Sequence, residues 1–474
     1  MSKFTFWLEK ITSEYKYLVI VSGLGAIISF IMGWSLVAAL VFTIYLIIKF
    51  MVGLNKSPNV LPVMVLLGIL QCFLIPAFLY TVMEHSEQAT TEWHELKDTY
   101  LVYGMASVIA LVLGFYLPIQ PFRNAISDNV STEFNIHSSF VPICFFLGIV
   151  SIIIRNYVPL GLNFLFYLLS STLYISCAAA IWSQHKYTLP ILCIALFVLF
   201  CSALNIKFLG IDLIITTVKG SAYEFVYWIG VFLIFYISRS KLNLYKKLAM
   251  VLVGFIFVFI VQVIKPSYRY YILEHNTSEL TVSFGFEYFY DLILHRIPRH
   301  VRHLDKNGYM LDRLNQGQHI IRAMDHVPVK EPFALGETIY EAFMASLVPR
   351  LIWPDKPIAG GEDKYYRFTG KHQPKDTSYN LGPIGEAYIN FGLIGGVIFL
   401  FCYGFFWRLS YQALILISKK HIPYLLYFFP LIFMAVIPVE TDLLTVLNHF
   451  VKSVGIAIIP VSYTHLTLPT KRIV

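Results

Sequence analysis

Residues 61–83 have the sequence LPVMVLLGILQCFLIPAFLYTVM, without one charged side chain. The hydrocarbon core of a bilayer is ~30 Å thick, and roughly 20 apolar residues in a helix cross it. In lipid, a helix is the structure that satisfies every backbone hydrogen-bonding group within one segment. This stretch therefore predicts a membrane-spanning helix.

Similar apolar runs occur along most of the chain. Of the 474 residues, 57% are hydrophobic and 14% are charged, whereas a soluble domain has about 25% charged residues. We therefore expect an all-α fold, a polytopic transmembrane helix bundle of about 11–12 spans. The predicted spans are 17–33, 35–53, 61–83, 100–118, 139–154, 159–182, 188–205, 221–237, 248–264, 383–406 and 423–439, with an amphipathic twelfth candidate at 441–459.

The distribution of charge predicts an orientation. Basic residues concentrate in cytoplasmic loops. Residues 239–247 hold four basic residues and no acid, whereas residues 85–98 hold four acidic residues and one Lys. Counting crossings then places the N-terminus in the cytoplasm, with Arg155 and Lys207 as exceptions. The net charge of +8 fits a membrane protein with basic loops, and we expect no nucleic-acid partner.

The segment 265–382 is much richer in charged residues than the apolar runs around it. Its 118 residues hold 15 Lys and Arg, 14 Asp and Glu, and 7 of the 14 His. We expect a large, mostly helical extracytoplasmic loop that covers the membrane domain. The predicted organisation is an N-terminal bundle of about nine spans (1–264), this loop (265–382) and C-terminal transmembrane helices (383–460).

The last residues have a different character. Residues 461–470, VSYTHLTLPT, resemble a translated sequencing-adapter sequence, so we expect 461–474 to be a non-native tail.

Several classes of chemistry lack support in the sequence. All six cysteines lie in apolar segments at spacings that fit no metal site, so neither a disulfide framework nor a metal is expected. Nucleotide-binding and serine-hydrolase motifs are also missing from the sequence, and no cofactor is expected.

Cations gather at the end of the loop, around residues 347–357, LVPRLIWPDKP. Guanidinium and ammonium groups bind phosphate, so this pattern suits an anionic substrate, although a solvated loop has the same composition. The candidate binding residues are Arg350, Lys356, Lys364, Arg367 and Lys371. Arg299 and Arg302, in HRIPRHVRH at 295–303, form a second cluster that fits a lipid-headgroup anchor or a substrate site equally well.

Glu386, at the start of the predicted span 383–406, is a candidate catalytic carboxylate, and Glu341 and Asp355 are others. Glu386 fits a general base at the membrane edge. It also fits an ordinary acidic residue that stabilises a helix N-terminus.

The layout and two motifs, PRLIWPDKP (349–357) and GEAYINFG (385–392), resemble the O-antigen and capsule repeat-unit polymerases, the Wzy type. This resemblance implies a membrane glycosyltransferase, without a cofactor, on the outer face of the bacterial cytoplasmic membrane. It would transfer glycan from one undecaprenyl pyrophosphate to another lipid-linked repeat unit, in a pathway that makes lipopolysaccharide or capsule. A chain-length regulator is a possible partner.

The resemblance also suggests roles for the candidate residues. Arg350, Lys356 and Arg367 would stabilise the departing pyrophosphate. Glu386 would deprotonate the acceptor hydroxyl, with His372 as a substitute. Lys364, Lys371, Arg299, Arg302 and Tyr388 would bind glycan or pyrophosphate.

Three other functions fit the same sequence. An O-antigen ligase shares the layout and the lipid donor. A lipid-linked oligosaccharide flippase would carry more charge at mid-membrane. A structural or sensory membrane protein could use the loop to bind a partner.

Overall fold

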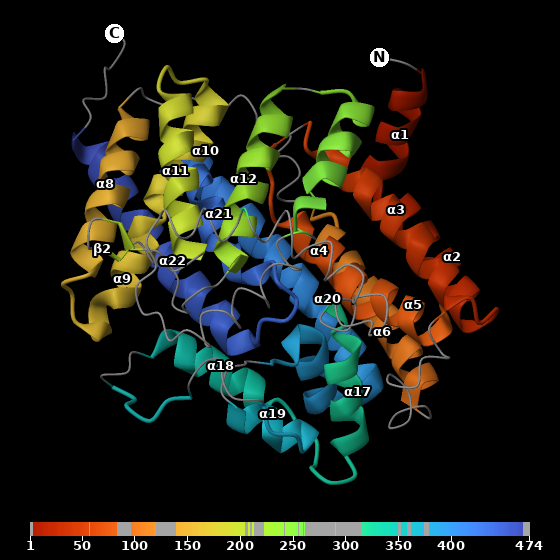
Figure 1. Cartoon of the computed structure of the whole chain (residues 1–474). Helices are drawn as coiled ribbons and strands as arrows, with labels where there is room; N and C mark the ends of the chain where they lie inside the picture. The colour runs from red at the N-terminus through yellow and green to blue at the C-terminus, as the bar shows by residue number, and fades with distance from the viewer. Residues whose placement is uncertain are drawn as a thin grey trace.

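In the computed structural model, most of the described residues lie in helices (Figure 1). The structure describes residues 3–55, 57–82, 96–119, 139–203, 207–208, 211–212, 222–240, 242–254, 256–258, 260, 290, 314–348, 352–357, 362–373 and 379–467.

Five helical stretches in the described residues are long and apolar enough to cross a membrane. Three are single helices: α3 (Ser35–Gly53), α6 (Lys97–Tyr116) and α20 (Gly382–Lys420). The stretch Pro62–Thr81 is made of three consecutive elements, α4 (Pro62–Ile69), η1 (Leu70–Leu74) and α5 (Ile75–Val82). The stretch Asn163–Ser183 is made of α9 (Leu160–Ser170) and α10 (Thr172–Ser183). The multi-pass character predicted from the apolar runs therefore has a structural counterpart in these five stretches.

The N-terminal part also contains α1 (Lys3–Ser13), α2 (Tyr15–Phe30), α8 (Phe140–Arg155), α11 (Thr188–Ala203) and α12 (Ala222–Ser240). Two strands of two residues each, β1 (Lys207–Phe208) and β2 (Ile211–Asp212), pair antiparallel with Phe208 opposite Ile211. Apart from this ribbon, the described residues confirm the all-α prediction.

Helices α6 and α20 approach so closely that their backbones touch. A Cβ atom added at Gly404 would overlap the carbonyl oxygen of Leu111, and one at Gly114 would overlap that of Phe401. Small residues permit this approach between apolar helices, because no side chain separates the two backbones.

α20 is two helices joined at Gly392, whose φ of 67° and ψ of −160° are not helical. Glycine adopts this conformation readily because it has no Cβ atom. A Cβ at Gly396 would lie 3.2 Å from the backbone carbonyl of Ala387, although nine residues of straight helix cover about 13.5 Å. The chain therefore folds back, and residues 382–391 (the inner arm) pack on residues 393–420 (the outer arm).

This fold-back corrects the predicted span 383–406. The outer arm is about 42 Å long at 1.5 Å per residue, enough to cross a bilayer alone. The inner arm is buried from Gly382 to Asn390, so Glu386 does not open the crossing helix. Residues 383–406 are helical in the structure, as predicted, except at Gly392. The non-helical backbone of Gly392 divides them into two arms.

The predicted span 423–439 is also not one helix. It consists of η5 (Pro423–Phe428), α21 (Phe429–Ile432) and η6 (Met434–Val436). Proline has no N–H and clashes with the preceding helical turn, so Pro430 and Pro438 prevent a continuous helix. α22 (Leu443–Thr467) follows and covers the amphipathic twelfth candidate.

Three described helices come from the predicted loop: α17 (Gly317–His326), α18 (Glu337–Leu347) and α19 (Glu362–Thr369). We call them the cap helices. They lie together at the end of the molecule opposite both chain termini (Figure 1). The segment between α17 and α18 is bonded to the inner arm at two points. The Ala334 N–H donates to the carbonyl oxygen of Ile389 (2.9 Å). The Tyr388 hydroxyl donates to the carbonyl oxygen of Val327 (3.0 Å).

Replacing Gly404 by Ala should destabilise the protein by about 1–3 kcal/mol, because the added methyl overlaps the backbone of α6. Thermal unfolding in detergent, followed by tryptophan fluorescence, measures the effect. Gly230→Ala is the matched control, since nothing lies within 4 Å of its added Cβ atom. Equal melting temperatures for the two variants would contradict the backbone contact.

Candidate functional site

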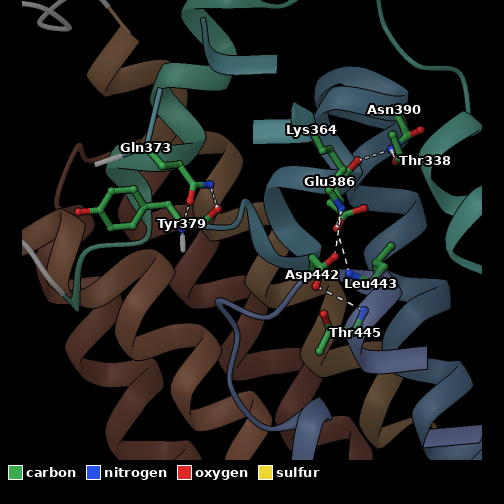
Figure 2. A network of polar contacts seen from close by, with 9 residues as sticks. All are labelled: Thr338, Lys364, Gln373, Tyr379, Glu386, Asn390, Asp442, Leu443 and Thr445. Atoms are coloured by element: carbon green, nitrogen blue, oxygen red, sulfur yellow. Dashed lines mark hydrogen bonds and ion pairs between the residues drawn. The ribbon is translucent and has the colours of Figure 1, made fainter. Parts of the chain in front are cut away.

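Three charged side chains from separate elements meet where the cap helices join the bundle. The Lys364 ammonium on α19 lies 2.9 Å from Oε1 of Glu386 on the inner arm and 3.5 Å from Oδ2 of Asp442, just before α22 (Figure 2). Glu386 and Asp442 are 0% and 1% exposed, whereas the Lys364 side chain is 25% exposed. Solvent therefore reaches the cluster through Lys364.

The start of α22 supplies a second donor to Glu386. The Leu443 N–H donates to Oε1 of Glu386 (2.9 Å), and the Thr445 N–H donates to Oδ1 of Asp442 (3.3 Å). The first N–H groups of a helix have no intrahelical partner, and Asp is a preferred N-cap residue. Both carboxylates thus also benefit from the positive end of the α22 dipole.

The cluster is not electrically balanced. One ammonium faces two buried carboxylates, and Oε2 of Glu386 has no hydrogen-bond partner among the described residues. A buried charge with an open acceptor position is costly, and such groups are characteristic of functional sites. Oε2 is therefore the oxygen of Glu386 without a partner among the described residues, and it is buried like the rest of the side chain.

Lys364 remains charged in this setting. Burial alone would lower its pKa, but the charges and hydrogen bonds of Glu386 and Asp442 raise it by more, so the pKa of Lys364 lies above its ordinary value of 10.5. Lys364 is therefore an ammonium at any physiological pH.

Asn390 fixes the inner arm against α18. Its amide donates to the Glu386 carbonyl (2.8 Å) and to Thr338 Oγ1 (2.7 Å), and its oxygen accepts from the Gly336 N–H (3.0 Å). Thr338, Glu386 and Asn390 are buried, and Figure 2 shows the contact between Asn390 and Thr338. The backbone that carries Glu386 is therefore held rigidly.

A second buried contact lies within the cap. His319 Nδ1 is 2.8 Å from the Tyr365 hydroxyl, which also accepts from Nη1 of Arg322 (3.3 Å). Burial and the nearby Arg322 charge lower the pKa of His319 to about 3, so the ring is neutral at physiological pH. The Gln373 side chain makes two hydrogen bonds with the backbone of Tyr379 (Figure 2). Its Nε2 donates to the Tyr379 carbonyl (2.7 Å), and its Oε1 accepts from the Tyr379 N–H (3.0 Å).

Of the candidate residues predicted from sequence, the structure brings Lys364 and Glu386 together. Lys356 is buried, and its ammonium donates to the Ala345 carbonyl (2.8 Å) and the Val348 carbonyl (3.1 Å). These carbonyls end α18, so Lys356 stabilises the C-terminus of that helix.

Arg367 and His372 have partners on the cap surface. Arg367 donates to Oε1 of Glu331 (2.6 Å) and to both oxygens of Glu337 (3.0 and 3.1 Å). His372 stacks on Tyr366 and lies 3.3 Å from Glu362.

The remaining candidates divide into two groups. Lys371 is exposed, and the hydroxyl of Tyr388 is bonded to Val327 as described above. Arg350, Arg299 and Arg302 lie outside the described residues. In the part of the chain that the structure describes, no group of three or more His, Cys, Asp or Glu side chains could hold a metal ion.

The sequence analysis missed Asp442. Its position before the apolar run of α22 is an N-cap signal, which could have marked the helix start. Nothing in the sequence pairs it with Lys364, which is 78 residues away.

Lys364→Met should destabilise the protein by about 3–5 kcal/mol, because it leaves two buried carboxylates without a cation. Adding Glu386→Gln to this variant should recover part of the loss. Lys371→Met is the control, since Lys371 is exposed. A double variant that melts below Lys364→Met would show that the charge is not the cause.

The His319 ring predicts a pH dependence of stability. Its pKa is lower in the folded state, so the unfolded chain binds more protons between pH 6.5 and about 3. Stability should therefore be complete above pH 6.5 and fall by about 1.4 kcal/mol per pH unit below it. Melting temperatures at pH 7.5, 6.5 and 5.5 should show a shallower slope for His319→Gln; an unchanged slope would refute the assignment.

The comparisons with known proteins follow this geometry. The model of a family described as a domain of unknown function, DUF8712, matches residues 102–418, from α6 to the outer arm. No curated protein and no solved structure matches the chain. The matched region contains Lys364 and Glu386 and ends before Asp442. Because it covers more than half of the 474 residues, the chain belongs to the DUF8712 family.

Proposed function

We propose that the protein is a membrane glycosyltransferase that polymerises oligosaccharide repeat units linked to undecaprenyl pyrophosphate, producing O-antigen or capsular polysaccharide. One observation carries the proposal. The motif at 385–392, on which the resemblance to repeat-unit polymerases rests, forms most of the inner arm, and its one charged residue, Glu386, belongs to the buried cluster.

The proposed location is the bacterial cytoplasmic membrane, crossed about 11–12 times, with a cytoplasmic N-terminus and the cap helices outside. Asp98 and Leu393 line one groove, so the acidic start of α6 lies at the same end as the cap helices. Lys419 and Lys420 end the outer arm, in its last turn. This distribution agrees with basic residues on the cytoplasmic side.

The proposed reaction uses an activated donor. The acceptor hydroxyl gives its proton to Glu386, and its oxygen bonds to the anomeric carbon of the donor sugar. The bond from that carbon to the lipid pyrophosphate breaks, and the pyrophosphate leaves with the electron pair. Glu386 then releases the proton to water, so the step needs neither nucleotide nor cofactor.

The leaving pyrophosphate requires cations. Lys356 and Arg367 already serve the cap itself, through the α18 carbonyls and the Glu331 and Glu337 carboxylates. Lys364 is the described cation that contacts Glu386. We therefore propose that Arg350 stabilises the departing pyrophosphate and that Lys364 interacts with the base, Glu386.

A groove between α6 and the outer arm suits the lipid part of the substrate. Its volume is about 660 Å³, and Val102, Leu393 and Val397 are among the residues that line it. Tyr103, also in its wall, donates a hydrogen bond to the Ile384 carbonyl of the inner arm (2.8 Å). An apolar chain in this groove would lie next to the arm that carries Glu386.

Complementation tests the function. In a deletion strain of the source organism, Glu386→Gln at normal membrane level should give glycans of one repeat unit, whereas Glu362→Gln on the cap surface should restore long chains. Gel electrophoresis of the extracted glycans measures this. Long chains from Glu386→Gln would reject the proposed base. Ladders on the lipid carrier when ligation is blocked distinguish a polymerase from a ligase.

A further inference from the structure

Asp442 lies beside the proposed base and has no role in the function proposed so far. Its two oxygens have separate partners: Oδ1 accepts from the Thr445 N–H (3.3 Å), and Oδ2 faces the Lys364 ammonium (3.5 Å). The first contact begins α22. The second contact is an ion pair that Asn or Ser could not make, although either residue caps a helix as well as Asp does.

The two oxygens of Glu386 are also unequal. Oε1 accepts from the Lys364 ammonium and from the Leu443 N–H, both at 2.9 Å. Oε2 is buried and has no hydrogen-bond partner among the described residues. A carboxylate that acts as a base needs one oxygen within reach of the proton that it removes.

Lys364 can occupy several positions, because four rotatable bonds connect its ammonium to the backbone. Asp442 approaches it from the α22 side while Glu386 approaches from the inner arm. With both carboxylates in place, the ammonium is held at Oε1. Without Asp442, it is free to move to Oε2 and block that atom.

We infer that Asp442 is a positioning residue, which holds the Lys364 ammonium on one oxygen of Glu386 and leaves the other oxygen free to accept the proton of the acceptor hydroxyl. The inference rests on the proposed function. It adds the identity of the reacting atom and a residue beyond the region that the family model matches.

Asp442 should also tune the basicity of Glu386 by its charge. Among the described residues, the titratable groups that interact with Glu386 or its ion pair are Lys364 from α19, Asp442 before α22 and Tyr403 from the outer arm. The other packed elements carry Tyr103 of α6, which bonds to Ile384, His319 of α17, which bonds to Tyr365, and Glu337 and Glu341 of α18. A negative neighbour makes a carboxylate hold its proton more tightly, and a positive neighbour has the opposite effect.

The test is the pH dependence of polymerisation in cells with variants at the two partners. Cells are grown in media buffered from pH 5 to 8, and the lengths of the extracted glycan chains are compared. Asp442→Asn keeps the helix cap but removes a negative charge, so loss of long chains should occur at a lower pH than in the wild type. Chains at pH 7.5 should be shorter, because the base is weaker and its free oxygen is blocked.

Lys364 supplies the opposite shift. Lys364→Gln removes a positive charge, so loss of long chains should begin at a higher pH, whereas Lys364→Arg keeps the charge and should not move that pH upward. A purely structural role would shorten chains equally at every pH. Asp363→Asn, on the exposed start of α19, is the control for removal of an acid.

The outcomes separate the two proposals. If Glu386→Gln abolishes long chains and Asp442→Asn matches the wild type at every pH, the positioning role is rejected and the polymerase proposal stands. If Glu386→Gln retains long chains, the proposed base itself is rejected. If Asp442→Asn fails to accumulate in the membrane, Asp442→Ser takes its place, because Ser also caps a helix and removes the same charge; wild-type chain lengths from that variant at every pH would reject the inference.

Discussion

The ion pair between Lys364 and Glu386 holds together three parts of the chain that are far apart in sequence. A carboxylate that is 0% exposed needs a cation or strong donors, because an isolated buried charge is very costly. Glu386 obtains both, from α19 and from the first N–H of α22. The inner arm, the cap and α22 are therefore fixed relative to one another by one oxygen atom.

This contact is possible only because the chain folds back at Gly392. In a straight helix, Glu386 would continue the axis of the crossing segment, away from the start of α22. The fold-back instead returns the inner arm toward the bundle, where Gly382 packs against the carbonyl of Val439 so closely that no Cβ would fit. Two glycines with positive φ, at 382 and 392, thus begin and end the inner arm.

The cap uses most of its described cations for its own structure. Lys356 binds the carbonyls at the end of α18, and Arg367 joins Glu331 to Glu337. Such contacts order a surface segment through several charged hydrogen bonds at once. The rigid cap then presents Lys364, the cation of α19 that reaches Glu386, in a defined position. The proposed chemistry depends on this arrangement more than on the number of basic residues.

The sequence by itself determined the apolar helices, because burial in lipid depends on the composition of each run and needs no knowledge of its neighbours. It also marked Glu386 and Lys364 as chemically interesting residues. The prolines in 423–439 are also a local signal against one continuous helix. The sequence did not determine that Glu386 and Lys364 meet or that Asp442 joins them. Only the tertiary structure decided these points, because an ion pair requires two distant segments to be brought within 4 Å, and the reversal at Gly392 depends on a backbone conformation that no apolar pattern encodes.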